Sequence, residues 1–405
     1  MSIPKSLLGK TATRKNLEDA WRDISRFAFD SSHGMSGETI QDFRSNLKEN
    51  LKIIRAQLLN GEYTFGELRA ATKKKKSGKK RPLKIADIRD RVVQRAIARI
   101  LEKYLNDKFD LKNPASFAYL KGKGVQAAIK QMLKYHQDGC NIILEADIEN
   151  FFDTVRVDDL LNNMIYPNLR DDTLNMLIKE AFEMEIGNRE YLSEEEKLLF
   201  PEDLIGLPQG GYLSPLFSNI YLSGFDYIMI KNELFLIRYA DDFIVMCKSF
   251  AQAEKAYELA ISVLEEELGL KIHKRNDKDK KAKTRVIELG TEKIKFLGVQ
   301  SDGKRVLPDP EKKNELSHKL AIIRSESKTV LHLLTSTRNL LEGWIASYCF
   351  TDINEAYINS IDNEVDRILW STLGNLKWKL EPRLICERIN LDQKLLESRS
   401  LNLRH

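Results

Sequence analysis

Leu234–Met246 reads LFLIRYADDFIVM: two apolar runs joined by a short polar segment that contains Asp241 and Asp242. Apolar runs separated by a few turn-compatible residues predict a β-hairpin with both strands largely buried. Two adjacent carboxylates at a hairpin tip repel each other, so we expect a cation to neutralise them. Because alternate strand residues face opposite sides, one aspartate is expected to bind metal and the other to support it. An isolated pair of this kind would instead indicate a solvated turn.

A second carboxylate site lies upstream in Ile142–Val155, IILEADIENFFDTV. Its first three residues predict a buried strand, and Asp147 ends that segment. If this strand adjoins the hairpin, Asp147 and Asp241 would offer oxygen ligands to hard divalent cations, which suits Mg²⁺. Two such ions roughly 3.5–4 Å apart can catalyse an in-line phosphoryl transfer. Asp153 competes for this role, but a helix-start or turn role is favoured for it.

Three segments together resemble one enzyme family. Tyr239–Asp242 is similar to the YxDD box of bacterial group II intron-like reverse transcriptases. Asp147–Asp153, DIENFFD, resembles their first carboxylate motif, and Gly206–Leu222, GLPQGGYLSPLFSNIYL, resembles the segment under the nucleotide and template. The segments follow the family's order. The resemblance implies an α+β right-hand polymerase, with fingers, a palm whose antiparallel sheet carries the YADD hairpin, and an all-helical thumb.

The resemblance also implies roles for residues of the metal and nucleotide sites. Asp147, Asp241 and Asp242 would be catalytic, with two Mg²⁺ ions (Mn²⁺ a possible substitute) held by Asp147, Ile148, Asp241 and Asp242.

Four further residues would bind the incoming nucleotide. Arg81 and Lys75 would clamp its triphosphate, and Gln209 would wall the sugar pocket. Phe152 would exclude a 2′-hydroxyl, although a core phenylalanine is the alternative. We expect Phe151 and Phe152 to face opposite sides of a strand, so that only one of them is buried. Lys84 stands where relatives usually carry glycine.

Two basic segments are candidates for contact with phosphates. Arg69–Lys84 carries nine basic residues and no acidic one, and Lys271–Arg285 carries eight against two aspartates. Solvated loops are the alternative for both. The resemblance adds Lys121, Lys123 and Lys283 as nucleic-acid-binding residues, and Lys283 could protonate the leaving pyrophosphate. The arginines of the predicted helix Asp87–Asn106 either form a solvated face or contact template phosphates: Arg89, Arg91, Arg95 and Arg99.

The 405 residues, 42% of them hydrophobic, can bury a large core in two or three subdomains. The predicted organisation is an N-terminal helical extension (1–65), fingers (66–145 and 180–215), palm (146–179 and 216–305), thumb (306–375) and tail (376–405). Further helices are predicted over Leu17–Phe29, Glu38–Leu59, Ala251–Leu268 and Pro310–Leu373, with an acidic insertion within Asp171–Leu204 to which we assign no chemistry.

The composition indicates the redox environment of the protein and whether a membrane partner is expected. The net charge is +5, and four scattered cysteines without a CxxC pair favour a reduced, cytoplasmic protein. No leader-like start and no run approaching 18 apolar residues is present, so no membrane partner is expected.

The predicted function is RNA-directed DNA synthesis, with an RNA template, a primer and dNTPs as partners. A stand-alone anti-phage defence enzyme with a dedicated structured non-coding RNA is the first hypothesis. The alternative is a group II intron-encoded maturase that lacks the endonuclease domain. The complete carboxylate set disfavours a catalytically silent RNA scaffold, and Phe152 disfavours an RNA-dependent RNA polymerase.

Overall fold

The computed structural model describes residues 6–26, 33–74, 78, 80–200, 206–327 and 329–375. The chain divides into two compact units, Met1–Ile287 and Glu288–His405. Helices and antiparallel sheets occur in both, which confirms the α+β class. Within the described ranges, no helix combines the length and apolar character that crossing a membrane requires.

Four helices begin the first unit: α1 (Leu7–Thr11), α2 (Arg14–Ser25), α3 (Ile40–Ser45) and α4 (Leu47–Asn60). The helix predicted over Glu38–Leu59 is therefore two helices. Thr39 caps α3 in a capping box with Asp42, and the backbone leaves helical geometry at Asn46 (φ −116°) before α4 begins. Part of the helix predicted over Leu17–Phe29 lies outside the described residues.

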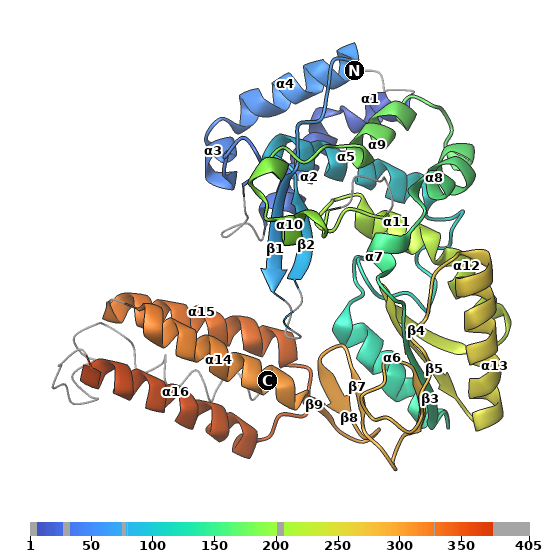
Figure 1. Ribbon diagram of the computed structural model, residues 1–405, viewed down its shortest axis with the longest axis vertical. Coiled ribbons are helices and arrows are strands. Elements are labelled where there is room, and N and C mark those ends of the chain that lie inside the picture. The colour runs from blue at the N-terminus through green and yellow to red at the C-terminus, as the bar shows by residue number, and fades with distance from the viewer. Residues whose placement is uncertain are drawn as a thin grey trace. The chain divides into compact units, whose positions relative to one another are not determined.

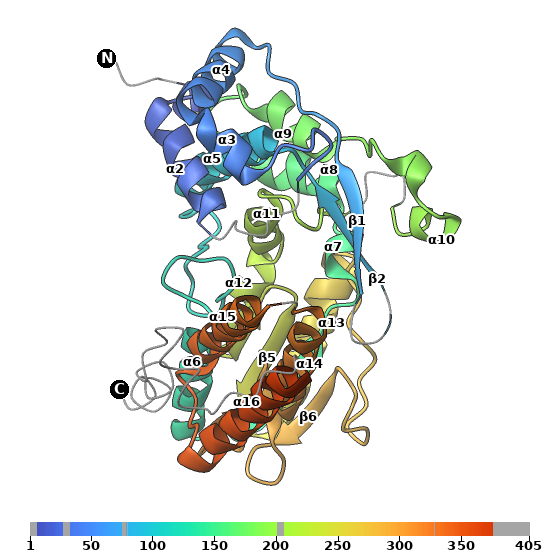
Figure 2. The ribbon, with the colours of Figure 1, turned by 90° about the vertical axis from the view of Figure 1, so that its left-hand side faces the viewer.

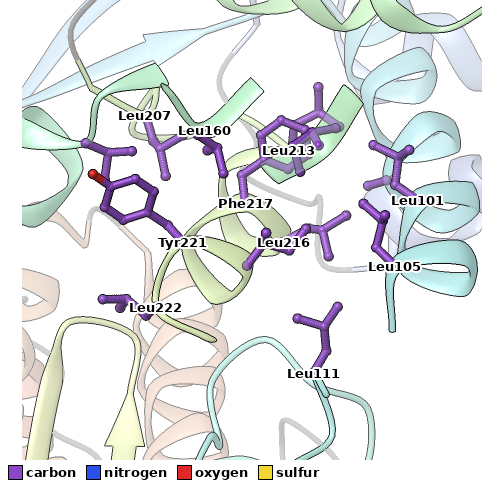
Figure 3. Close-up of a cluster of buried hydrophobic side chains, with 14 of the residues drawn as sticks. Leu101, Leu105, Leu111, Leu160, Leu207, Leu213, Leu216, Phe217, Tyr221 and Leu222 are labelled. Carbon is purple, nitrogen blue, oxygen red and sulfur yellow. The ribbon is translucent and has the colours of Figure 1, made fainter. Parts of the chain in front are cut away.

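The first basic segment forms a two-stranded antiparallel hairpin, β1 (Arg69–Lys74) and β2 (Lys80–Ile85). It is followed by α5 (Ile88–Leu105), which begins after Asp87 as predicted. One face of α5 is apolar and lies in the core, with Ile88, Val92, Ile97 and Leu101 fully buried. Figure 3 shows Leu101 and Leu105 of α5 beside residues of α11 (Ser214–Tyr221) in one hydrophobic cluster.

A four-stranded sheet forms the centre of the first unit, in the order β4 (Phe235–Tyr239), β5 (Asp242–Cys247), β3 (Ile142–Asp147), β6 (Arg285–Glu288), and β5 is antiparallel to both β4 and β3. Helix α6 (Val125–Gln137) packs against β4 and β5, and α13 (Phe250–Ile261) packs against β3 and β5 (Figure 1). Every residue of β5 from Phe243 to Cys247 is buried. Burial on both faces explains the continuous apolar runs, which differ from the alternation of a half-exposed strand.

Shorter elements connect these parts. They are α7 (Phe151–Thr154), α8 (Val157–Asp159), η1 (Leu160–Ile165), η2 (Tyr166–Asn168), α9 (Asn175–Phe182), η3 (Arg189–Tyr191), α10 (Glu194–Lys197), α12 (Ser223–Lys231) and η4 (Ser262–Glu267). Helix α13 continues into η4, a π-helical segment, so the predicted span Ala251–Leu268 is helical as far as Glu267.

In the described part of the second unit are a three-stranded sheet, β7 (Ile294–Phe296), β8 (Val299–Ser301) and β9 (Val306–Pro308), and three helices, α14 (Pro310–Glu326), α15 (Val330–Tyr348) and α16 (Glu355–Asn375). The helices account for the helical segment predicted over Pro310–Leu373. Leucines and β-branched residues of α14 and α16 form the core of this unit. The sheet lies in the second unit, although the predicted palm extends to residue 305. The subdomain assignment stays a prediction.

Candidate active site

The YADD segment forms the tip of the β4–β5 hairpin. Tyr239 pairs with Asp242, so the loop consists of Ala240 and Asp241 alone. Ala240 has φ +60°. Two-residue hairpin loops favour turns whose first central residue has a positive φ, because their twist matches that of the strands. The predicted hairpin is thus confirmed, and the turn holds a non-glycine residue in a conformation that costs free energy.

Asp147 lies directly opposite Asp242 in the antiparallel pair β3–β5. Directly opposed residues of neighbouring strands have their side chains on the same face of the sheet. The prediction that the first carboxylate strand adjoins the hairpin is confirmed. Asp241 follows Ala240 in the loop, one residue before Asp242, so three carboxylates from two distant segments meet at this end of the sheet.

Each of these carboxylates makes the ionisation of its neighbours less favourable. Burial, together with the negative charges of Asp147, Glu145 and Asp241, raises the pKa of Asp242 to about 8. Burial also raises the pKa of Asp241, with Asp147 adding to the rise and Arg81 and Lys283 opposing it. Two or more carboxylates in one partly buried space require a cation before all of them can be ionised.

Lys283 supplies one such cation, because its ammonium forms an ion pair with the carboxylate of Asp147. The ammonium stands in for the positive charge that a divalent ion would bring to this oxygen. Its Nζ is also 3.1 Å from Nε2 of His273. The contact places Lys283 in the carboxylate site, and its proposed contact with nucleic acid stays a prediction.

His273 and Glu149 also belong to this cluster, and the sequence reasoning missed both. Nδ1 of His273 is 3.2 Å from Oε1 of Glu149, and Nε2 is 3.6 Å from Oδ2 of Asp147. The backbone N–H of His273 donates to the carbonyl of Asp147 at 3.1 Å. No local sequence signal pointed to this pairing, because it joins two segments more than a hundred residues apart.

The donor set fits a hard divalent cation, because it consists of partly buried carboxylate oxygens that repel one another. Asp147, Asp241 and Asp242 would hold such an ion, and Ile148 could contribute only its backbone carbonyl. Across the described ranges, no group of three or more His, Cys, Asp or Glu side chains is close enough together to enclose a metal ion.

Arg238 links the hairpin tip to the buried Asp226, a role that the sequence did not predict. Its guanidinium is fully buried and donates to both carboxylate oxygens of Asp226 at 2.6 Å. It also donates to the carbonyl of Ala240 at 3.1 Å and to Oγ of Ser116 at 3.1 Å. A charged residue inside an apolar run needs a buried partner, and this was the signal available in the sequence.

The Pro-Gln-Gly turn contains Gln209, one of the residues predicted to bind the nucleotide. Nε2 of Gln209 donates to Oδ1 of Asp153 at 3.0 Å, and the backbone carbonyl of Gln209 accepts from the N–H of Lys84 at 3.1 Å. Gly206 has φ +92°, and a Cβ there would lie 2.5 Å from the carbonyl oxygen of Phe152. Glycine is therefore required for the 206–211 loop to approach α7.

The two phenylalanines are placed as expected, but for a different reason. Phe151 is buried and Phe152 is partly buried. Both lie on the short helix α7, which follows Asn150 at φ +48°, so the strand geometry assumed for them is wrong. The first turn of a helix, not strand alternation, separates the two rings, which meet edge to face at 5.3 Å. The sugar-gate role of Phe152 stays a prediction.

Of the two residues predicted to clamp the triphosphate, Arg81 lies within the described residues. Arg81 is exposed on β2, and its charge acts on both Asp241 and Tyr119, so it faces the carboxylate site. Lys75 lies outside the described residues. Lys84, next to Gln209, is half-buried, and burial lowers the pKa of its ammonium while the charge of Asp153 opposes this.

The two lysines of the glycine-containing loop differ. Lys121 is exposed. Lys123 donates to the carbonyl of Ser116 at 2.8 Å and lies 5.0 Å from the ring centre of Phe117. Contact of Lys123 with nucleic acid stays a prediction, and it would require the ammonium to leave these acceptors.

The arginines of α5 make contacts within the protein. Arg99 bonds to Asp19 and Asp23 on α2, and Arg95 bonds to Asp23 and Glu102. Of the others, Arg89 donates to Gln57 at 2.8 Å and Arg91 to the carbonyl of Ala86 at 2.8 Å. These contacts favour a structural role over contact with template phosphates.

Fold and site together define a right-hand polymerase. Residues 72–301 match the family model described as "Reverse transcriptase (RNA-dependent DNA polymerase)". This match covers more than half of the chain, and the chain belongs to that family.

Several curated proteins are similar to this chain. An uncharacterised 91 kDa protein in the cob intron of Schizosaccharomyces pombe is 26% identical over 325 residues, covering 66% of this chain and 37% of that protein. Protein YkfC of Escherichia coli is 27% identical over 281 residues, covering 59% of this chain and 70% of that protein. The group II intron-encoded protein LtrA of Lactococcus lactis subsp. cremoris is 29% identical over 205 residues, covering 50% of this chain and 32% of that protein.

These similarities confirm a group II intron-like reverse transcriptase. The chain spans little more than a third of the first of these relatives, at 37% of its length.

Proposed function

We propose that this protein is an RNA-directed DNA polymerase that extends a primer by nucleotidyl transfer. The observation that supports this most is the placement of Asp147 directly opposite Asp242, beside Asp241 in the hairpin turn. Such a site suits a reaction in which negative charge accumulates on phosphate oxygens.

Two divalent ions, Mg²⁺ or Mn²⁺, would supply Lewis-acid stabilisation of the phosphate charge when held by Asp147, Asp241 and Asp242. In the reaction a primer 3′-hydroxyl attacks the α-phosphate of a dNTP, and pyrophosphate leaves. The protein's own part is orientation and charge. Arg81 is exposed on β2, and its charge interacts with that of Asp241. It binds the triphosphate, with Lys75 as its proposed partner.

Lys283 has two roles in this proposal. Its ammonium balances Asp147 before substrate arrives, as the ion pair indicates. Once released from Asp147, it can donate a proton to the departing pyrophosphate. Its side chain is 58% exposed, so it can move without unfolding its surroundings.

The sugar pocket is formed by Gln209 and Phe152. The hydrogen bond from Gln209 to Asp153 fixes the glutamine beside α7, which carries Phe152. A ring at this position would exclude a 2′-hydroxyl and so select deoxynucleotides.

The activity is tested with purified protein, an RNA template annealed to a DNA primer, Mg²⁺ and labelled nucleotides. Extension with dNTPs to a DNase-sensitive, alkali-stable product is expected. Extension with ribonucleotides instead, or on DNA templates alone, would contradict the proposal. An Asp138→Asn variant, altered at an exposed position after α6, controls for the loss of a surface carboxylate.

For the cellular role, we propose cDNA synthesis from a dedicated structured non-coding RNA in an anti-phage defence system. The complete carboxylate set supports a polymerising enzyme over an RNA scaffold. The alternative is an intron-encoded maturase, which the names of the intron-encoded relatives favour. Sequencing the RNA that co-purifies with the protein discriminates between them: one small non-coding RNA supports defence, and intron RNA supports the alternative.

A further inference from the structure

Residues 185–197 lie along the β1 edge of the β1–β2 hairpin. The backbone N–H of Leu68 donates to the carbonyl of Glu185 at 2.7 Å, and the N–H of Gly187 donates to the carbonyl of Leu68 at 3.0 Å. Leu68 and Ile186 thereby form a parallel bridge. Figure 2 shows the chain leading to α10 running beside this hairpin. The edge of β1 is therefore paired where it begins.

Asn188 continues this pairing with its side chain. Its Oδ1 accepts from the N–H of Ala70 at 2.7 Å, and its Nδ2 donates to the carbonyl of Ala70 at 3.0 Å. One carboxamide thus satisfies both backbone groups that Ala70 presents at the edge, as a neighbouring strand would.

Glu196 then joins both strands of the hairpin. Its Oε1 accepts from Nζ of Lys80 on β2 at 2.9 Å and lies 3.4 Å from the hydroxyl of Thr72 on β1. Its Oε2 accepts from the N–H of Ser193 at 3.4 Å, in the capping box of α10. The capping box holds the glutamate in place, so its position is set before the lysine binds.

At the end nearest α5, the hairpin is held by the hydrogen bond from the N–H of Lys84 to the carbonyl of Gln209. A two-stranded hairpin alone is only marginally stable in water. Lys80 immediately precedes Arg81, the residue assigned to the triphosphate. Contacts that hold Leu68, Ala70, Thr72 and Lys80 therefore also set where Arg81 lies.

We propose that residues 185–197 form an edge clamp, in which Asn188 and Glu196 are positioning residues that hold the β1–β2 hairpin so that Arg81 meets the triphosphate. This inference rests on the proposed polymerase function. The clamp does not touch the reacting atoms, so it acts on nucleotide binding more than on the chemical step.

The kinetic test uses Glu196→Gln and Asn188→Ala in the full chain, with Glu195→Gln as the matched control. Glu195 is exposed on the same helix, one residue away. Loss of one hydrogen-bonded contact, about 1 kcal/mol, corresponds to a rise of roughly fivefold in the KM for dNTP. We expect kcat to change less than twofold and the control to match the wild type. The exchanged pair, Lys80→Glu with Glu196→Lys, should return the KM for dNTP most of the way to the wild-type value.

Hydrogen exchange of the Leu68 and Ala70 amides gives a readout independent of polymerisation. Both amides should exchange faster in Asn188→Ala than in the wild type and the control. Unchanged exchange would overturn the clamp. Faster exchange with an unchanged KM, or a raised KM that the exchanged pair fails to rescue, would overturn the positioning role. A wild-type protein that cannot polymerise would refute the proposed function, while the exchange comparison would still test the clamp.

Discussion

Arg238 and Asp226 form a fully buried ion pair in which both carboxylate oxygens accept from the guanidinium at 2.6 Å. Asp226 lies on α12, and Arg238 lies two residues before Ala240, whose carbonyl also accepts from Arg238. The positive φ of Ala240 costs free energy, and this hydrogen bond compensates for part of it. The pair thus ties the hairpin tip to the helical core.

Asp226→Asn should destabilise the protein strongly, because it leaves the guanidinium of Arg238 buried without a compensating charge. The expected loss is about 3–5 kcal/mol in the free energy of unfolding, measured by urea denaturation. Arg14→Met, which breaks the exposed pair with Glu18, serves as the comparison and should cost less than about 1 kcal/mol. Equal effects of the two variants would show that the buried pair does not anchor the hairpin.

The stability of the metal-free protein should fall as the pH rises, because of Asp242. Its pKa is raised from 3.8 to about 8 in the folded protein. Between these values the folded state keeps a proton that the unfolded state has lost, so unfolding releases a proton and higher pH favours it. This stabilisation is complete below pH 3.8 and is lost as the pH passes about 8.

Asp242→Asn removes this titration. Relative to the wild type, its free energy of unfolding should increase by about 2 kcal/mol between pH 5 and pH 8, a value reduced for partial exposure. Asp138→Asn should keep the wild-type profile. Parallel pH profiles for wild type and Asp242→Asn would refute the raised pKa.

Phe152→Ala should admit ribonucleotides, because it removes the ring proposed to exclude the 2′-hydroxyl. The measurement is the ratio of kcat/KM for dNTP to that for the matching NTP, which should fall by at least about tenfold, or 1.4 kcal/mol. Phe151→Ala is the neighbouring control. Since Phe151 is 1% exposed, that variant should lose about 3–5 kcal/mol of stability instead. Unchanged sugar discrimination in Phe152→Ala would rule out the gate role.

Arg95→Met and Arg99→Met should reduce stability without weakening nucleic-acid binding. Arg95 bonds to Asp23 and Arg99 to both Asp19 and Asp23 on α2, and each loss should cost about 1 kcal/mol. The dependence of RNA affinity on salt should keep its slope, because no phosphate contact is removed. A slope reduced by about one unit per arginine would instead place these residues on the template.

The β4–β5 hairpin, the strand β3, the helix α5 and the meeting of the two carboxylate segments could be predicted from sequence. Each depends on a local pattern, such as an apolar run ending in Asp147 or the apolar spacing of α5. The contacts of Arg238, His273, Asn188 and Glu196 could not be predicted, because each joins segments distant in sequence through a single side chain. The strand assumed for Phe151 fails for a local reason, since Asn150 turns the chain into α7.

The most direct test of the central claim is primer extension on an RNA template by Asp241→Asn, compared with the wild type and Asp138→Asn at equal folded concentration. If Asp241 helps to hold the cations at the hairpin tip, its rate should fall at least roughly a hundredfold, while the Asp138 variant keeps full activity. Normal extension by Asp241→Asn would contradict the account.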